Sequence, residues 1–207
     1  MGNNITTNNL KPFALIVLFL TSYLPLFMLI MIRQISNNKA YLVFGGINKQ
    51  SIMIFIEKFG LSAVLGIISI FSLIGLKILL ANLHKNADNG DYVTVSSLQN
   101  RNSEAIGYIA TYIVPFVFSD FSSIFDIFLM IFIMLIIYRI YIYSNMIAIN
   151  PILNFKYSIY EISYKDKIVD RSCVVISDNR ELQENDKIKI YEIGYKIFFS
   201  PKESLRQ

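Results

Sequence analysis

Four apolar stretches in the first 144 residues constrain the fold of this chain more than any other feature. Residues 12–32 carry no charged side chain, and residues 60–81 carry only Lys77. A helix needs about 20 mostly apolar residues to cross the hydrocarbon core of a bilayer. We therefore expect an integral membrane protein, an α-helical transmembrane bundle. Its four spans are expected at about residues 12–32, 60–81, 105–121 and 124–144.

The charged residues are distributed unevenly, and this divides the chain in two. Hydrophobic residues make up 54% of the sequence and charged residues only 16%, whereas soluble domains average about 25% charged residues. Most charges follow residue 145. We expect a membrane domain over residues 1–149 and a small domain in the aqueous phase over residues 150–207.

The first span contains Pro25 near its centre. Proline lacks a backbone N–H and its ring pushes against the carbonyl four residues earlier, here that of Thr21, so a kink is expected. The hydroxyls of Thr21 and Ser22 are placed to help satisfy the backbone groups that the kink frees.

Small residues recur through the second and third stretches. In lipid they let helix backbones approach closely, and serines can bond across the interface. Packing faces are one interpretation, and the ordinary glycine content of membrane spans is the other. The candidate helix-packing residues are Ser62, Gly66, Ser69, Gly75, Gly107 and Thr111.

The third stretch is the shortest. Its uncharged core, residues 105–118, is about 21 Å long at the helical rise, and Pro115 predicts a further kink. A short, kinked span extended to residue 121 is one interpretation. The other is a re-entrant helix, which a bilayer tolerates only where protein or water covers it.

Four charges lie in or beside the spans and are candidate pathway or interface residues: Lys77, Asp120, Asp126 and Arg139. Near the end of a span, a lysine usually extends its ammonium to the headgroups, but it could also line a pore. Acidic residues beside the last hairpin could form a cation-binding ring in an oligomer, or could simply be solvated.

The positive-inside rule gives an orientation. The short connection before the last span has Asp120 and no basic residue, whereas Arg139 and Lys156 follow at the other end. This places both termini in the cytoplasm. The first connection argues against it, because four basic residues lie at or near its edges: Arg33, Lys39, Lys49 and Lys58.

Residues after 155 alternate apolar and polar side chains, as in residues 187–193. Four short strands separated by turns predict an antiparallel β-rich domain. About 50 residues make a marginal core. We expect this domain to lean on the membrane helices, a second subunit or a partner.

The sequence contains one histidine, His84, and one cysteine, Cys173. A metal cluster of His and Cys, an internal disulfide and Cys–His catalysis therefore lack the residues that they require. His84 is expected to be a solvated interface residue and Cys173 an inert buried thiol. We expect no enzyme and no cofactor. The net charge of +4 comes without a basic run, so no direct contact with nucleic acid is expected.

Two segments resemble one family. Residues 112–123 (YIVPFVFSDFSS), followed by a long span and then Asn150-Pro-Ile-Leu-Asn154 leading into a tyrosine-rich strand, resemble KwaA, the membrane subunit of the bacterial Kiwa anti-phage system. The resemblance implies an oligomeric sensor in the bacterial inner membrane, a tetramer, that senses membrane perturbation at phage infection. It also implies a soluble DNA-binding partner, KwaB. Our hypothesis is that this partner docks within residues 151–207, at residues that the sequence does not identify. The alternative is an oligomeric ion channel or pore-forming effector.

Overall fold

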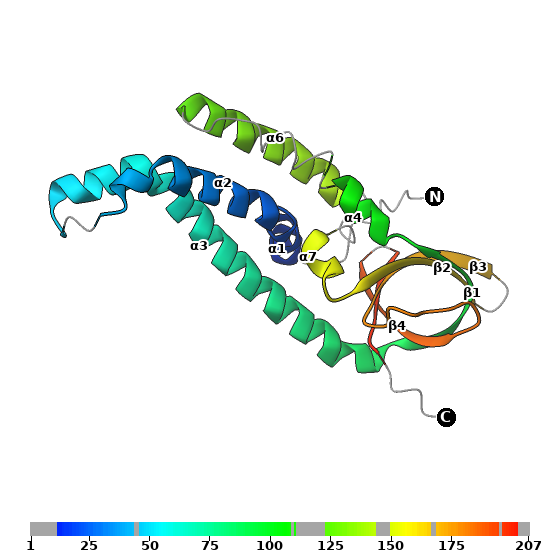
Figure 1. The fold of residues 1–207 in the computed structure, drawn as a ribbon. Coiled ribbons are helices and arrows are strands. Elements are labelled where there is room, and N and C mark those ends of the chain that lie inside the picture. Colours follow the sequence, from blue (N-terminus) through cyan, green and yellow to red (C-terminus); the bar gives the residue numbers. More distant parts are fainter. Residues whose placement is uncertain are drawn as a thin grey trace.

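The computed structural model describes residues 12–43, 46–108, 110, 123–143, 150–166, 169–194 and 196–202. An elongated helical unit is joined at one end to a closed five-stranded barrel (Figure 1). The helices are α1 (Pro12–Ser22), α2 (Leu24–Asn37), α3 (Lys49–Asn86), α4 (Asn102–Tyr108), α6 (Ile124–Tyr143) and α7 (Pro151–Asn154), with short 3-10 turns η1 (Lys39–Tyr41) and η2 (Ala87–Asn89). The strands are β1 (Asp91–Asn100), β2 (Ser158–Asp166), β3 (Val169–Ser177), β4 (Lys187–Gly194) and β5 (Ile197–Ser200).

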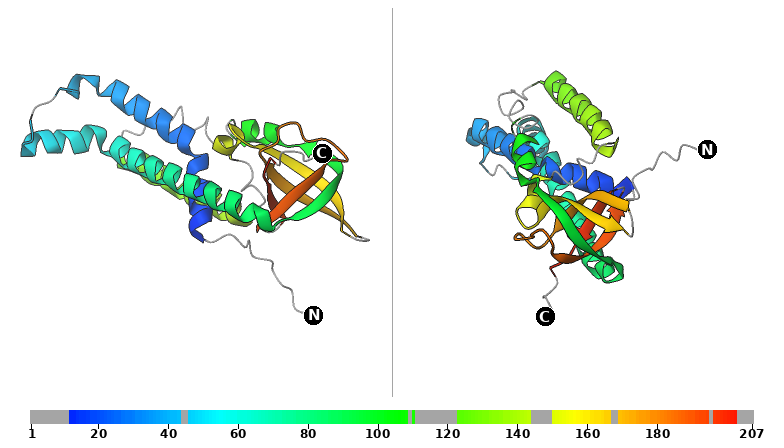
Figure 2. Two further views of the ribbon diagram at one scale, coloured as in Figure 1. Left: turned by 90° about the horizontal axis from the view of Figure 1, so that it is seen from below. Right: turned by 90° about the vertical axis from the view of Figure 1, so that its right-hand side faces the viewer.

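The chain bends sharply between α1 and α2, as Figure 2 shows. The two helices meet at 50° around Tyr23, and proline occupies the first turn of α2. The Thr21 hydroxyl donates to the Leu18 carbonyl at 2.9 Å, and the Ser22 hydroxyl donates to the Phe19 carbonyl at 2.6 Å. The kink expected from the proline is therefore present, and the two hydroxyls bond to backbone carbonyls beside it.

Helix α2 runs antiparallel to α3, and α1 crosses α3 after the bend, so both pack against it (Figures 1 and 2). A Cβ atom added at Gly75 would lie 2.8 Å from Val17 Cγ2 on α1, and one added at Gly66 would lie 3.6 Å from Met31 Sδ on α2. Glycine therefore permits this approach of the backbones at Gly75, because a larger residue would displace a stiff β-branched side chain.

In the part of the chain that the structure describes, two helices are long and apolar enough to cross a membrane, within Lys49–Asn89 and Ile124–Ile142, and the bent pair α1–α2 would make a third. Helix α3 contains the stretch predicted over residues 60–81, and α6 corresponds to the one predicted over 124–144. Of the stretch predicted over residues 105–121, only the first residues belong to a described helix, α4. Most of that stretch lies outside the described residues.

The barrel has the strand order β1-β2-β3-β5-β4, closed by pairing of β4 with β1. All neighbouring strands pair antiparallel except β3 and β5, which pair in parallel. The expectation of a wholly antiparallel domain was therefore wrong for this one pair. Strand β1 also differs from expectation, because all of the predicted strands lie after residue 155. Val95 is fully buried in the barrel. The barrel therefore combines a segment from the middle of the membrane region with the C-terminal tail.

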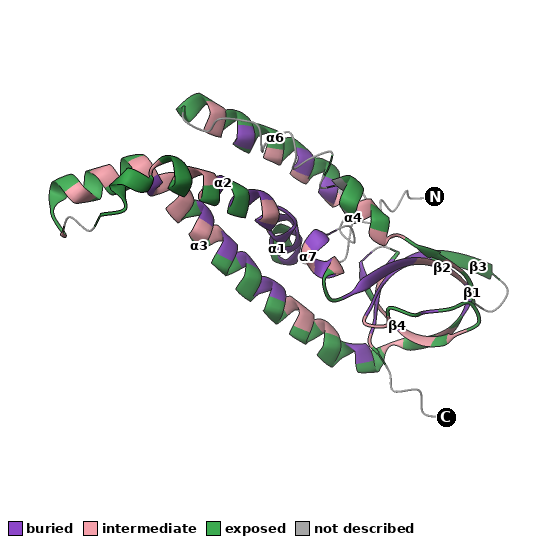
Figure 3. Ribbon diagram, in the orientation of Figure 1, coloured by how far each residue is buried: buried purple, intermediate pink, exposed green. Residues whose placement is uncertain are grey.

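The barrel strands contribute to two apolar clusters, and Figure 3 shows buried residues along β2. The barrel interior is filled by one cluster of buried side chains, among them Val95, Ile162 and Val175. Side chains of the opposite parity, among them Ile176 and Phe199, belong instead to the cluster that contains the buried residues of α1 and α2. A single apolar core thus runs from the helices to the outer wall of the barrel, which stabilises a domain that would be marginal alone.

Candidate functional site at the helix–barrel junction

Asn150 is fully buried and lies at the N-terminus of α7, between α6 and the first strand of the C-terminal tail, β2. Its amide nitrogen donates to the Leu18 carbonyl at 3.0 Å and to the Thr21 hydroxyl at 2.9 Å. Its side-chain oxygen accepts from the backbone N–H groups of Ile152, at 2.9 Å, and Leu153, at 3.4 Å. Asparagine is a favoured N-cap, and proline after it suits the first helical position. This one side chain therefore caps α7 and connects it to the bend of α1.

His84 makes the second connection, from the last turns of α3. Its Nε2 lies 2.8 Å from Asp178 Oδ2, just after β3, and its Nδ1 lies 2.8 Å from the Leu80 carbonyl. Both neighbours are hydrogen-bond acceptors. His84 was expected to be a solvated interface residue. The structure places it in a specific contact with the barrel, although its side chain is 39% exposed.

Aromatic rings surround this contact. The His84 ring meets Phe199 of β5 edge-on at 4.9 Å, and Phe199 meets Tyr157 at 5.9 Å. Burial, and then the negative charge of Asp178, raise the pKa of Tyr157. Its phenol therefore stays neutral, and the junction carries the acidic charge of Asp178 opposite His84.

A third connection joins α1 to α6. The Phe19 ring meets Tyr138 at 5.0 Å and Tyr141 at 5.4 Å, both edge-on. Such edge-on pairs are favoured by the aromatic quadrupole. Helix α1 therefore contacts α3, α6 and α7 at once, and any movement of α1 must disturb several elements that adjoin the barrel.

The predicted packing residues fall in two places. Four of them lie on the face of α3 that meets α1 and α2: Ser62, Gly66, Ser69 and Gly75. The backbone N–H of Ser62 donates to Gln34 Oε1 of α2 at 2.7 Å. Ser69 and Gly75 are buried. A Cβ atom at Gly107 in α4 would meet nothing within 4 Å, so the structure shows no close approach there. Thr111 lies outside the described residues.

The predicted charges are not gathered into one cluster. Lys77 is exposed on α3 and Arg139 is exposed on α6. Asp126 accepts from the Ser123 hydroxyl at 2.9 Å and donates its backbone N–H to that hydroxyl at 3.1 Å, as a reciprocal cap of α6. Asp126 and Arg139 therefore lie near opposite ends of α6, about 20 Å apart along its axis. Asp120 lies outside the described residues.

Among the described residues, no group of three or more His, Cys, Asp or Glu side chains could hold a metal ion. Cys173 is buried in the barrel, and this burial, with the charge of Glu161, raises its pKa to about 12. The thiol is therefore neutral near pH 7 and a poor nucleophile. The chemistry of the described site therefore consists of the contacts that Asn150, His84 and Phe19 make between elements.

Comparison with known families decides the identity of the chain. The family model of the anti-phage protein KwaA matches residues 14–199. This chain belongs to the KwaA family. The match runs from α1 to β5 and so includes the helices, the barrel and the junction between them. No curated protein and no solved structure matches the chain.

Membership of the KwaA family gives the chain a role in anti-phage defence, and its apolar helices accord with association with a membrane. The sequence alone did not identify the junction. Asn150 was named only within the segment that resembles KwaA, and the Leu18 carbonyl that it binds lies 132 residues away. No local pattern in this KwaA-family sequence pairs His84 with Asp178.

Proposed function

We propose that this chain is a non-enzymatic scaffold and sensor in the bacterial inner membrane. It senses perturbation of the bilayer at phage infection and docks a cytosolic DNA-binding effector, which the resemblance to KwaA implies is KwaB. The observation that carries the proposal is the junction: the end of α1 is bonded to Asn150, at the start of the α7 segment that leads into β2, and the end of α3 is bonded to Asp178, which follows β3.

The order of the described elements supports four crossings. Helix α3 ends at the barrel, and α4 follows β1 directly beside it. Helix α6 begins at the opposite end, where Ser123 and Ile124 lie near Asn38 and Lys58. Helix α4 and the start of α6 thus lie at opposite ends of the helical unit. Four crossings put the N-terminus and the barrel on one side, which the basic residues after α6 indicate is the cytoplasm.

The junction supplies a route from bilayer to barrel. Helix α3 is about 57 Å long at the helical rise, much longer than the hydrocarbon core of about 30 Å. A change in bilayer thickness costs fractions of a kcal/mol per Å through tilt and packing. Tilting of α3 would move His84 against Asp178, and straightening of the α1–α2 bend would pull on Asn150.

An exposed patch on the barrel suits a docking partner. Tyr92 of β1 is 54% exposed, and the ammonium groups of Lys187 and Lys189 of β4 each lie 5.5 Å from its ring centre. An aromatic ring between two cations is a surface that an acidic partner would recognise. Lys187 and Lys189 fall within residues 151–207, as predicted for docking, whereas Tyr92 does not.

The test is a pull-down of the soluble partner from cells that express the full chain. Deleting residues 151–207 would remove β2 to β5 and destroy the barrel, so surface substitutions are the informative change. We expect Lys187→Glu with Lys189→Glu to reduce recovery at least tenfold. Lys165→Glu, an exposed change on β2, is the matched control. Equal recovery from both variants would rule out this patch as the docking surface.

The competing function, an oligomeric channel or pore-forming effector, predicts ion flux through liposomes that contain the chain. Flux that changes on neutralising Lys77 or Asp120 would favour the channel. The described charges support the scaffold instead, because Asp126 caps its own helix and lies far along α6 from Arg139.

A further inference from the structure

The segment that joins α7 to β2 exposes an aromatic ring beside two cations. Phe155 is 77% exposed, although its neighbour Tyr157 is buried. Lys156 follows it and is exposed, and the Arg180 guanidinium donates to the Phe155 carbonyl. One exposed apolar side chain needs no explanation by itself, but a ring flanked by two cations forms a defined surface. We call Phe155, Lys156 and Arg180 the Phe155 patch.

The two cations of the patch contact uncharged groups. Arg180 donates to a backbone carbonyl, and Lys156 Nζ lies 5.3 Å from the ring centre of Tyr157, whose phenol stays neutral. Glu181 follows Arg180, is exposed, and offsets one of the two charges. The patch thus combines an exposed ring with a cation available to an anionic ligand.

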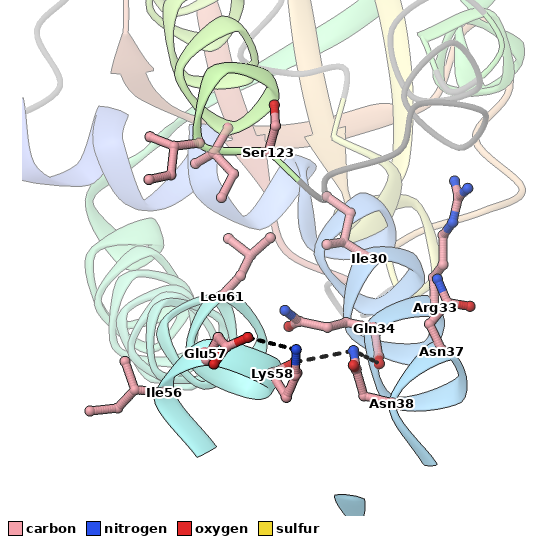
Figure 4. Close-up of a pocket in the computed structure, with 12 residues that line it drawn as sticks. Ile30, Arg33, Gln34, Asn37, Asn38, Ile56, Glu57, Lys58, Leu61 and Ser123 are labelled. Atoms are coloured by element: carbon pink, nitrogen blue, oxygen red, sulfur yellow. Dashed lines mark hydrogen bonds and ion pairs between the residues drawn. The ribbon is translucent and has the colours of Figure 1, made fainter. Parts of the chain in front are cut away.

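The polar groups at the opposite end of the helical unit bond to one another instead (Figure 4). Lys58 Nζ lies 2.6 Å from Glu57 Oε1, and the Asn38 amide donates to the Lys58 carbonyl at 3.3 Å. The charge of Lys58 is therefore compensated within the chain, and the Phe155 patch is the stronger candidate for a ligand outside it.

Contacts place the Phe155 patch beside the polar last turn of α3. That helix ends in His84-Lys85-Asn86, and His84 Nε2 lies 2.8 Å from Asp178 Oδ2. Arg180 follows Asp178 by two residues and bonds to Phe155. Figure 1 shows α7 and the segment after it between the helices and the barrel. If α3 crosses the bilayer as proposed above, the patch lies at headgroup depth.

We propose that the Phe155 patch binds anionic phospholipids of the inner leaflet. The Phe155 ring lies at the boundary between headgroups and acyl chains, and Lys156 and Arg180 lie against lipid phosphates. Side chains with an apolar body and a basic tip favour this depth, and the anionic cytoplasmic leaflet attracts basic residues near its surface. Asn150 caps the helix that precedes the patch, so a change in headgroup packing acts directly on the segment bonded to α1.

This inference deepens the proposed function and rests on it, since it needs the barrel end of the helices to face the inner leaflet. The sequence contains no tryptophan, so Phe155→Trp introduces a single fluorescent probe. The test places the full chain in nanodiscs of phosphatidylcholine and phosphatidylglycerol, with or without bromine on the acyl chains. We expect bromination to lower the fluorescence of Phe155→Trp by about half, because a side chain at this boundary meets the upper acyl chains.

Two further tryptophan variants calibrate the result. Val169→Trp should keep its fluorescence, because Val169 is 60% exposed and pairs with Asp166, at the end of β2 remote from α7. Phe71→Trp, 69% exposed in the middle of α3, should be quenched. Quenching of Phe71→Trp without quenching of Phe155→Trp would overturn this inference and leave the proposed function standing. Failure to quench Phe71→Trp would defeat the proposed function itself.

The anionic headgroup is tested in the same Phe155→Trp background. Adding Lys156→Gln with Arg180→Gln should remove at least half of the quenching. Lys165→Gln with Arg171→Gln, the matched pair at exposed positions of β2 and β3, should leave it unchanged.

Nanodiscs of phosphatidylcholine alone should reduce the quenching of Phe155→Trp to a similar extent. This measurement changes no residue of the patch, and so it guards against misfolding of the double variant. Equal quenching in both lipid compositions would show an apolar contact without recognition of the headgroup, and would overturn the proposal.

Discussion

The Asn150 amide lies 3.0 Å from the Leu18 carbonyl, across 132 residues of sequence and in a site without solvent access. The Leu18 carbonyl lies near the end of α1, just before the 50° bend to α2. The end of α1 therefore supplies the acceptor, and the N-cap of α7 supplies the donor.

Asn150→Ala should destabilise the whole chain, since it removes the cap of α7 and two buried hydrogen bonds to α1, at the Leu18 carbonyl and the Thr21 hydroxyl. We expect a loss of about 2–3 kcal/mol. The single buried thiol, Cys173, allows unfolding in detergent to be followed with a maleimide fluorophore. Asn86→Ala, at an exposed position, is the control and should be near neutral; equal midpoints for the two variants would contradict the role of Asn150.

The two glycines predicted together as packing residues should respond differently to alanine. Gly75→Ala places a Cβ 2.8 Å from Val17 and should destabilise by about 1–3 kcal/mol. Gly107→Ala meets nothing within 4 Å and should be neutral or stabilising by up to about 1 kcal/mol. The double variant Val17→Ala/Gly75→Ala should recover part of the loss. No recovery would mean that the clash is not with Val17.

Cys173 should resist alkylation in the folded protein. With its pKa raised to about 12, the thiolate fraction at pH 8 is about 10⁻⁴. Iodoacetamide should therefore react about a thousandfold more slowly than with Ser172→Cys in a Cys173→Ala background, since residue 172 is exposed. Similar rates for the two thiols would contradict the burial.

The same thiol predicts the direction of a pH dependence. Its folded pKa lies above the ordinary value of 9.0, so the unfolded chain loses this proton first as the pH rises. Stability should therefore be unaffected by this group below about pH 8 and should fall between about pH 9 and 12, by at most ~1.4 kcal/mol per pH unit. Cys173→Ala should have a shallower alkaline slope.

Asp178→Asn should uncouple α3 from the barrel without unfolding either. The His84–Asp178 contact is partly exposed, so its loss should cost less than about 1 kcal/mol. Hydrogen exchange near His84 should accelerate, and protection of cells from phage should fall. Asp170→Asn, an exposed change on β3, should alter neither. Undiminished protection with faster exchange would show that this contact does not carry the signal.

Local features of the fold were predictable from the sequence because their causes are local. Pro25 predicted the bend, and the long apolar runs predicted α3 and α6. Strand β1 was missed because its apolar positions, such as Val93 and Val95, are few and its partners lie in β2 and β4, far along the chain. A mostly polar segment such as β1 can be recognised as a strand only when the strands that pair with it are known.

The contacts at the helix–barrel junction were less predictable, because the two partners of each contact lie far apart along the chain. Small residues on α3 indicated a close approach, but the partner helix could not be known before the α1–α2 bend was placed. His84 and Asp178 are 94 residues apart, and neither has a neighbouring motif. The sequence could name the kinds of residues that pack, and only the fold could pair them.

Labelling of single cysteines with a membrane-impermeant maleimide tests the central claim, that the helices cross the membrane and leave one composite barrel in the cytoplasm. In a Cys173→Ala background, cysteine replaces Asn48 at the far end of the bundle, Ser97 of β1 or Ser172 of β3, all exposed positions. In intact spheroplasts only residue 48 should be labelled, and residues 97 and 172 should react only after lysis. Labelling of residues 97 and 172 from opposite sides, or of all three from the same side, would contradict the account.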